Sequence, residues 1–357
     1  MRKLASIKQI SAIAPIEGKD LIGLATVDGW GVIIQKSQFQ PGDKCVYVEI
    51  DSVMPEKPEF EFLRKRDFRI RTLKMAGVIS QGICFPLSIL PPKKKGEYEL
   101  EEDVTDVIGV KQYEPTMDKE PERQEKKKYP RFLMRFKWFR QLMLGPKKKG
   151  GFPSFVSKTD ETRIQNMPFI LRDKREWIAT EKIDGQSGTF ALVRHKRPWP
   201  LKDRYEYIVC SRNLRLGKPD NSSYWRVSER YKIENALRNM IGDRDWIAIQ
   251  GECVASNVQG NKYKVSEPDL YVFNLIYPTG RLGSKVAKSI IENHGMKFVP
   301  IVEEHYVLPD TVQEVLDYAH GQSAIGDTIR EGIVFRSEDG AHSFKAVDPL
   351  FLLKYNE

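Results

Sequence analysis

Short β-rich runs closed by turn residues fill residues 1 to about 115, and this alternation most constrains how that part of the chain can fold. Runs such as ASIKQISAI and DKCVYVEI are each followed closely by Gly, Pro or Asp. The turns DGWG at residues 28–31 and PGDK at residues 41–44 would each reverse a pair of strands. We therefore predict a five-stranded β-barrel of the OB type, a fold whose open face commonly binds nucleic acid.

Aromatic and basic side chains are interleaved in FEFLRKRDFRIR, residues 60–71. Such a run would supply both a stacking surface for bases and cations for phosphates. A barrel strand with one buried face has the same pattern, so both interpretations stay open.

Residues 116–150 differ in composition from the residues before them. The stretch DKEPERQEKKKYP is charged and bounded by proline, which is typical of a linker. In the following RFLMRFKWFRQLML, one helical face carries four apolar side chains, Phe132, Phe136, Phe139 and Met143. This basic, amphipathic helix could bind a membrane or a partner, but docking between two domains is the favoured interpretation.

The charge of the chain favours a polyanionic partner. Lys and Arg number 58 and Asp and Glu 49, so the formal net charge is +9. Part of the excess lies in KKK runs at residues 93–95, 126–128 and 147–149, although such runs are often only solvated loops.

The remaining composition narrows the class of protein. The four cysteines are scattered and form no C-x-x-C pair, so neither a disulfide framework nor a zinc site is suggested. No run of about 18 apolar residues predicts a membrane helix, and the N-terminal MRKLASIKQI lacks the features of a signal peptide. We expect a soluble, cytoplasmic protein without a membrane partner.

The block from residue 151 onward predicts a mixed α+β domain. Its expected strands are residues 177–183, 187–193, 205–211, 246–254, 269–276, 331–337 and 342–347, and its expected helices are near residues 228–241, 285–295 and 311–321.

Within this block, TEKIDGQSG places Lys182 beside acidic residues at the end of a predicted strand. A lysine amine is a poor nucleophile at neutral pH unless burial, a second cation or a metal ion lowers its pKa. Later strands could bring two carboxylates, a lysine and an aromatic ring to one cleft with it: Glu252, Glu331, Lys345 and Phe273. This set predicts a site that handles nucleotides.

Such a site could transfer a nucleotide to the lysine. Attack of Lys182 on the α-phosphate of ATP would give a lysyl-AMP phosphoramidate and pyrophosphate, a step that relies on alignment and charge neutralisation. Asp184 and Glu331 would hold Mg²⁺ (or Mn²⁺) or its waters, since Mg²⁺ prefers oxygen ligands and needs only a few carboxylates. Gly185 would let the backbone turn close under the nucleotide.

The motif K-x-D-G, here KIDG, resembles the signature of the covalent nucleotidyltransferase superfamily of DNA ligases, RNA ligases and mRNA capping enzymes. CSRN at residues 210–213, QGECVASNVQGNKY at 250–263, YVFNLI, EGIV and FKAV follow it in the order found in ATP-dependent RNA ligases. QGE followed by NVQGNKY is similar to the double-strand RNA ligases, which seal nicks. GVISQGICFP at residues 77–86 and SKTDETRIQN at 157–166 resemble the branch typified by Naegleria and Deinococcus enzymes.

The resemblance implies a role for each matching residue. Lys182 would accept AMP, Glu181 would lie near the adenine, and Phe273 would stack on the base. Arg212 and Lys345 would bind phosphates. Glu252 would bind the ribose or metal waters, and Glu331 with Asp184 would hold the catalytic metal. Phage-type RNA ligases tend to carry a second lysine where this chain has Val347, so Lys354 is a candidate replacement.

The resemblance also implies an organisation. An OB-fold domain at residues 1–115 would bind nucleic acid. A basic linker and docking helix would follow at 116–150. The nucleotidyltransferase domain, of antiparallel sheets and helices and unrelated to the ATP-grasp fold, would occupy 151–357. The expected enzyme is a monomeric, ATP-dependent RNA ligase that joins 3′-OH and 5′-phosphate ends of nicked duplex RNA.

Three alternatives stay open. DNA ligases and capping enzymes usually carry a C-terminal OB domain, and only VDPLFLLKYNE follows FKA here. Two of the alternatives are therefore a DNA ligase and a guanylyltransferase that each lack that domain. A non-catalytic RNA-binding protein is the third alternative, although Lys182 and the carboxylates are all present.

Overall fold

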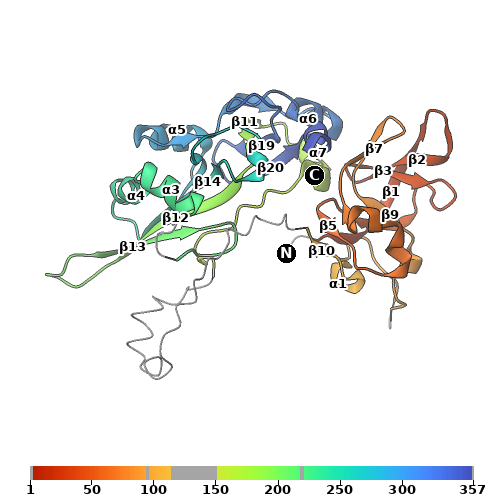
Figure 1. Ribbon diagram of the computed structural model, residues 1–357, viewed down its shortest axis with the longest axis horizontal. Helices are drawn as coiled ribbons and strands as arrows, with labels where there is room; N and C mark the ends of the chain where they lie inside the picture. Colours follow the sequence, from red (N-terminus) through yellow and green to blue (C-terminus); the bar gives the residue numbers. More distant parts are fainter. Residues whose placement is uncertain (1–2, 94–95, 114–150, 218–220, 356–357) are drawn as a thin grey trace, which may run out of the picture.

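A curled antiparallel sheet forms the N-terminal part of the protein, here called the barrel domain (Figure 1). The computed structural model describes residues 3–93, 96–113, 151–217 and 221–355. The strand order in the sheet is β3-β2-β1-β4-β9, and the strands are β1 (Ala5–Ile16), β2 (Lys19–Val27), β3 (Trp30–Gln35), β4 (Lys44–Val48) and β9 (Ile83–Phe85).

Strand β1 is long enough to serve both halves of the barrel. Its first residues pair with β4 and, after an irregularity between Ile10 and Ala12, the rest pairs with β2. The free edge of β3 meets the segment before β9, where the amide of Gln81 donates to the carbonyl of Gly31 at 2.8 Å. The sheet therefore curls back on itself and encloses a core that includes Ile7, Trp30 and Tyr47.

One of the two predicted turns is confirmed. The DGWG turn joins β2 to β3, which pair directly, with Val27 opposite Trp30. The PGDK prediction is wrong, because β4 pairs with β1 and not with β3. The segment at residues 41–44 instead carries the chain past two strands to the far side of β1.

Residues 60–71 do not form the continuous strand that the barrel-strand interpretation requires. The chain there forms the 3-10 helix η1 (Pro58–Arg66) and then the short strand β6 (Arg69–Ile70). Phe60 and Phe68 are buried in the barrel core, and of the three aromatic side chains only Phe62 is exposed. The aromatic residues of this run therefore serve mainly the core.

The barrel domain also contains several short elements. They are β5 (Ser52–Val53), β7 (Leu73–Met75), β8 (Val78–Ser80), η2 (Leu87–Ile89), α1 (Thr105–Ile108) and β10 (Lys111–Gln112). The predicted linker and docking helix at residues 116–150 lie outside the described residues, so the predicted domain limits stay predictions.

Two mainly antiparallel sheets build the C-terminal domain, described for residues 151–217 and 221–355 (Figure 1). The four-stranded sheet has the order β18-β11-β19-β20, with β11 (Glu176–Lys182), β18 (Ile301–Val307), β19 (Gly332–Ser337) and β20 (Ser343–Val347). The six-stranded sheet has the order β13-β12-β14-β15-β16 with β17 beside β15, and its strands are β12 (Gln186–His195), β13 (Arg204–Cys210), β14 (Trp246–Val254), β15 (Asp269–Tyr277), β16 (Gly280–Arg281) and β17 (Lys297–Phe298).

Helices cover the outer faces of both sheets. The six-stranded sheet packs against α3 (Ser223–Arg230), α4 (Ile233–Ile241) and α5 (Ser284–Asn293), and the four-stranded sheet packs against α6 (Val312–Ala319). The single helix predicted at residues 228–241 is two helices, because Lys232 adopts a left-handed conformation with φ 47°. The short helices η4 (Ile164–Asn166), η5 (Pro168–Arg172), η6 (Gln259–Asn261) and the last helix α7 (Pro349–Tyr355) complete the domain.

The chain crosses between the two sheets at two neighbouring places. Residues 183–185 lead from β11 to β12, and residues 299–300 lead from β17 to β18. The amide of Glu181 donates to the carbonyl of Pro300 at 2.9 Å, so the two crossings lie side by side. The cleft between the sheets is lined by Gln250, Asn274 and Arg281 of the six-stranded sheet and by Gly340 between β19 and β20.

The barrel domain packs directly on the C-terminal domain. Trp30 Nε1 donates to Asn166 Oδ1 at 2.6 Å, and the amide of Gly29 donates to the carbonyl of Gln165 at 2.9 Å. Val347 and Leu352 are buried in the same apolar cluster as the barrel core. The two domains therefore share an interface with both polar and apolar contacts.

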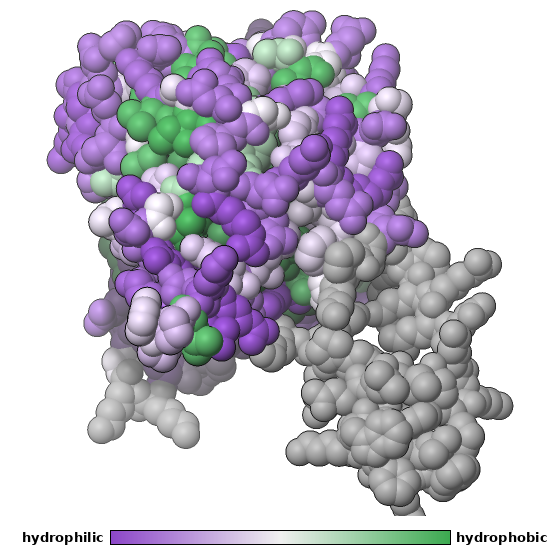
Figure 2. All heavy atoms as spheres, turned by 90° about the vertical axis from the view of Figure 1, so that its left-hand side faces the viewer, coloured by the Kyte–Doolittle hydropathy of each residue, from purple (hydrophilic) through white to green (hydrophobic). Residues whose placement is uncertain are grey.

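The surface of the C-terminal domain at the end away from the barrel domain is mainly polar. Figure 2 shows this face of the molecule as largely hydrophilic, with hydrophobic residues in small separate areas. None of the described helices combines the length and the apolar character needed to cross a membrane.

Candidate active site

The first crossing between the sheets carries Lys182. This lysine ends β11, where it pairs with Gly332 of β19, and its Nζ donates to Glu331 Oε2 at 2.5 Å. A Cβ at Gly332 would lie 2.1 Å from the carbonyl oxygen of Ala346 on the next strand. Glycine is therefore needed beside Glu331 for β19 and β20 to pair closely and set the position of its carboxylate.

Gly185 allows the six-stranded sheet to approach Lys182 closely. A Cβ at Gly185 would lie 2.5 Å from the carbonyl oxygen of Cys253 and 3.0 Å from Glu252 Cγ. The φ of Gly185 does not lie in the left-handed region, so its backbone conformation does not require glycine. The lack of space for a Cβ does. Ser187 then pairs with Glu252, so the start of β12 brings β14 to the lysine.

The carboxylates around Lys182 are close enough to affect one another. Burial raises the pKa of Glu252 to about 8, and the charges of Glu331 and Asp184 add to this increase while Lys182 opposes it. Burial by itself would lower the pKa of Lys182, but Glu331, Glu252 and Asp184 outweigh it and raise the pKa above its ordinary value. The lowered lysine pKa expected from the sequence is thus not found in this state of the protein.

Asp184 has a lysine partner that sequence reasoning did not single out. Lys262 Nζ lies 2.5 Å from Asp184 Oδ2, and the hydroxyl oxygen of Tyr263 accepts the amide hydrogen of Asp184 at 2.8 Å. Lys262 also lies against the rings of Phe351 and Tyr355 on α7, with its Nζ 4.8 and 4.4 Å from their centroids. Lys262 is part of NVQGNKY, and the sequence analysis used this motif only for its resemblance to RNA ligases, without assigning a role to its lysine.

Two of the predicted phosphate-binding cations converge on one carboxylate. Arg212 Nη2 lies 3.7 Å and Lys345 Nζ 3.4 Å from Asp160 Oδ1. Lys345 is mostly buried, whereas about half of the Arg212 side chain is exposed. Their positive charges therefore lie on one side of the cleft, where they could bind an anion in place of Asp160.

Lys354 does not join this group. It is exposed on α7, and its Nζ lies 5.2 Å from the centroid of the Tyr355 ring. The departure at Val347 has a packing reason, because this side chain is buried in the cluster that contains the barrel core. A lysine there would have to place its charge among apolar side chains.

Phe273 lies inside the cleft, as a base-stacking residue requires. A bulge in β15 follows the pairing of Asn274 with Gln250, and Phe273 is the extra residue. Its ring is partly exposed, and the guanidinium of Arg336 lies 5.7 Å from its centroid. Stacking on a base stays a prediction.

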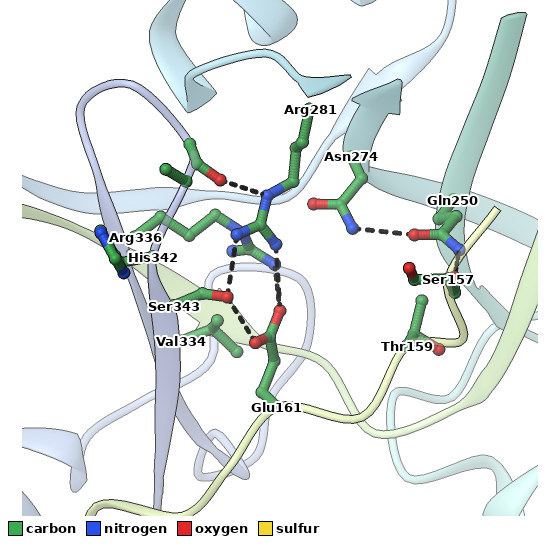
Figure 3. A network of polar contacts seen from close by, with 12 residues as sticks. Ser157, Thr159, Glu161, Gln250, Asn274, Arg281, Val334, Arg336, His342 and Ser343 are labelled. Atoms are coloured by element: carbon green, nitrogen blue, oxygen red, sulfur yellow. Dashed lines mark hydrogen bonds and ion pairs between the residues drawn. The ribbon is translucent and has the colours of Figure 1, made fainter. Parts of the chain in front are cut away.

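Arg336 belongs to a buried polar network that the sequence did not reveal. It donates to Thr180 Oγ1 at 2.8 Å. Its guanidinium lies 3.9 Å from Glu161 (Figure 3). Glu161 also accepts from Arg281 and Ser343. Burial lowers the pKa of Arg336 to about 10, which keeps it a cation at neutral pH. The network fixes residues 159–163 across the two sheets.

Glu181 points away from Lys182, since neighbouring residues of a strand face opposite sides. Its buried carboxylate accepts from the Ser323 hydroxyl and from the amide of Ala324 at 2.9 Å. Burial raises its pKa. This carboxylate therefore anchors the loop before β19, and its predicted place near the adenine stays a prediction.

The carboxylate set suits a divalent cation bound together with phosphates. Among the described residues, no three His, Cys, Asp or Glu side chains are placed to hold a metal ion by themselves. The charges of Asp184 and Glu331 nevertheless help to raise the pKa of Glu252, and a cation would relieve that repulsion. Mg²⁺ commonly uses one or two carboxylates, waters and substrate phosphates, which fits these residues.

Two family models match the chain. An OB-fold domain matches residues 4–87, and an RNA ligase model matches residues 175–355. None of the curated proteins compared with the chain matches it.

Solved structures of a Naegleria gruberi RNA ligase are similar over the whole chain. A variant with ATP and Mn is 30% identical, with a TM-score of 0.81 and coverage of 100% of both chains. A variant with AMP and Mn is 30% identical, with a TM-score of 0.81 and coverage of 99% of both chains. The enzyme with PPi is 29% identical, with a TM-score of 0.81 and coverage of 100% of this chain and 99% of that one.

These matches confirm the predicted fold class, an OB-fold barrel followed by a sheet-rich ligase domain with helices. They also decide between the alternatives that the motifs left open, because the matched model covers every motif from KIDG to FKAV. The chain belongs to the RNA ligase family.

Proposed function

We propose that this protein is an ATP-dependent RNA ligase that seals 3′-OH and 5′-phosphate ends, with nicked duplex RNA as its substrate. The observation that carries the proposal is the position of Lys182 at the crossing between the two sheets, among three carboxylates and opposite two cations. The ATP, AMP, Mn and PPi of the Naegleria structures support ATP and a divalent metal as cofactors.

The first step would be transfer of AMP to the enzyme. Lys182 Nζ, after losing a proton, attacks the α-phosphorus of ATP, a P–N bond forms, and the bond to the β-phosphate breaks to release pyrophosphate. Asp184, Glu252 and Glu331 would hold Mg²⁺ or Mn²⁺ directly or through its waters, and the ion would supply positive charge to the phosphates. Arg212 and Lys345 bind phosphate oxygens, and Phe273 stacks on the adenine.

Two further transfers would join the RNA. A 5′-phosphate oxygen of the RNA attacks the lysyl-bound phosphorus, so that AMP moves to the RNA and Lys182 regains its amine. The 3′-OH of the other end then attacks the 5′-phosphorus, a phosphodiester forms, and AMP leaves. Both steps depend mainly on alignment of the reacting groups. The monomeric state and the preference for duplex over other RNA ends remain part of this proposal.

The test is covalent labelling followed by sealing. With Mg²⁺ and ATP, the intact mass of the protein should increase by one AMP, and Lys182→Ala should not label. Lys285→Ala, which removes a surface lysine paired with Glu304, is the matched control and should label normally. Labelling of Lys182→Ala, or stronger labelling by GTP than by ATP, would refute the assignment. A labelled enzyme that joins no RNA would refute the RNA substrate alone.

A further inference from the structure

The hairpin between β12 and β13 ends in an exposed tryptophan. Figure 1 shows this hairpin projecting from the end of the ligase domain that lies farthest from the barrel. Trp199 at its tip is 93% exposed and Leu201 is 51% exposed. A tight turn needs no large apolar side chain, and Trp is usually largely buried, so this exposure requires an explanation.

The tip holds Trp199 in a restrained loop. Pro198 and Pro200 flank the tryptophan and limit the backbone on both sides. The amide of Leu201 donates to the carbonyl of Pro198 at 3.0 Å, and Asp203 accepts from the amide of Arg197 at 3.1 Å. A ring presented by a restrained loop loses little entropy when it binds a partner.

The tip carries an excess of cations close to Trp199 in the sequence. Residues 194–204 contain five Lys and Arg and one Asp, a net charge of +4 without the histidine. Arg194 pairs with Asp203, and Lys196 pairs with Asp245. Arg197, Lys202 and Arg204 are exposed and form no ion pair within the part of the chain that the structure describes. Charge therefore favours an anionic partner, and the ring favours one with flat apolar faces.

Single-stranded RNA combines these two properties, because it has phosphates at regular spacing and unpaired bases that stack on aromatic rings. In a duplex the bases are already stacked on one another, so only the phosphates would remain for the tip. A protein partner would make less use of three unpaired cations around one ring. We infer that the β12–β13 tip binds a single-stranded RNA segment that lies beyond the duplex around the ends being joined.

The position of the tip sets where that segment lies. Strand β12 begins four residues after Lys182 and runs for 10 residues to His195, four residues before Trp199. At ~3.3 Å per residue, the strand spans about 33 Å. The bound nucleotides would therefore lie on the order of ten positions from the joint. This inference rests on the proposed RNA ligase function and adds the form of RNA that lies beyond the joint.

The test compares two nicked substrates with wild-type protein and tip variants. Both substrates carry a short duplex around the nick, and beyond it one arm is either single-stranded or fully duplex. Trp199→Ala should weaken binding of the single-stranded-arm substrate about tenfold, in line with the loss of one base stack. Binding of the duplex-arm substrate should not change. Trp199→Phe should retain most of the affinity, whereas Trp199→Leu, which keeps an apolar side chain without a ring, should behave like Trp199→Ala.

The charges are tested through the salt dependence of binding. Lys202→Ala should lower the slope of log affinity against log salt by about 0.7 on the single-stranded arm, as expected for one lost phosphate contact. Lys196→Ala is the matched control, because Lys196 is already paired with Asp245 at 2.8 Å, and it should change the slope less. Trp199→Ala should leave the slope unchanged.

Labelling with AMP separates this inference from the proposed function. All tip variants should form the lysyl-AMP at the wild-type rate, since the tip is remote from Lys182. Equal affinity of wild type and Trp199→Ala for the single-stranded arm would overturn the inference and leave a protein partner for the tip. An equal loss on both substrates would also overturn it, because the ring would then contact duplex RNA. A wild-type protein that joins neither substrate would refute the proposed function itself.

Discussion

Lys262 and Asp184 form an ion pair of 2.5 Å, and their side chains are only 9% and 8% exposed. Asp184 comes directly before the glycine of KIDG, whereas Lys262 lies beside η6 and against the rings of α7. The pair therefore ties the crossing between the two sheets to the last helix. Charges this deeply buried depend strongly on their partners.

Lys262→Met should destabilise the protein by about 3 kcal/mol, because it leaves Asp184 buried without its lysine. Asp184→Asn in the same chain should restore part of that loss, since no buried charge then lacks its counterpart. Urea unfolding of the two single variants and the double variant measures the coupling. Lys264→Met, at the exposed lysine two residues on, should change the stability little. Independent effects in the double variant would show that the pair is not coupled.

Asp184→Asn and Glu331→Gln should each reduce AMP transfer about 100-fold, because each removes a charge with little change in volume. Asp184→Asn also leaves Lys262 buried without its partner, so the rates are compared at a temperature where circular dichroism shows each variant to be folded. Glu252→Gln should act similarly or mainly weaken nucleotide binding. The measurement is the initial rate of labelling as a function of Mn²⁺ concentration. Glu304→Gln, at a surface carboxylate paired with Lys285, is the control. Near-wild-type rates for both Asp184→Asn and Glu331→Gln would place the metal elsewhere.

Gly185→Ala should lower both stability and AMP transfer, since its Cβ would lie 2.5 Å from the carbonyl of Cys253. Relief of the clash would move β14, and Glu252 with it, away from Lys182. Gly217→Ala is the matched control, because a Cβ at Gly217 meets nothing within 4 Å. Thermal unfolding and labelling together test the prediction. Unchanged labelling by Gly185→Ala would mean that the close approach of the sheets is not needed for the reaction.

Gly29→Ala should separate AMP transfer from RNA sealing. A Cβ at Gly29 would lie 2.7 Å from the Cα of Gln165, so the substitution forces the barrel away from the ligase domain. Labelling of Lys182 should persist, and sealing of nicked duplex RNA should fall, most strongly at higher salt, if the barrel binds the RNA.

Deletion of the barrel is a less direct test, because it would expose Val347 and Leu352. Gly217→Ala again controls for the added methyl group. Sealing by Gly29→Ala at the wild-type rate at all salt concentrations would show that the ligase domain binds RNA without help from a docked barrel.

The elements that the sequence predicted best were those with a strong local signal. The strands at residues 246–254 and 269–276 match β14 and nearly match β15, because long apolar runs with β-branched residues and nearby turn signals define them. Lys182, Glu331 and Glu252 lie close together, as expected from their motifs. Lys182 of KIDG pairs with Gly332 of EGIV, which places Glu331 beside it, and Glu252 lies near enough to interact with both.

The residues that the sequence missed depend on contacts between distant segments. Lys262 becomes part of the site only because α7 packs against it, and Arg336 only because residues 159–163 cross the cleft. Residues 60–71 stayed open between two interpretations for a related reason, since the same aromatic spacing occurs in the 3-10 helix η1 and the turn after it, which bury Phe60 and Phe68. Local pattern alone does not decide between these environments.

The two neighbouring crossings between the sheets give the cleft the mechanics of a hinged clamp. In any rigid rotation of one sheet against the other about residues 183–185 and 299–300, displacement grows with distance from that axis. Lys182 and Asp184 lie at the axis and would keep their spacing, while side chains farther out along the sheets would sweep through longer arcs. Opening of the far rim would have to break the hydrogen bonds from Arg281 to Ser343 and to the carbonyl of Gly340, which join the two sheets there.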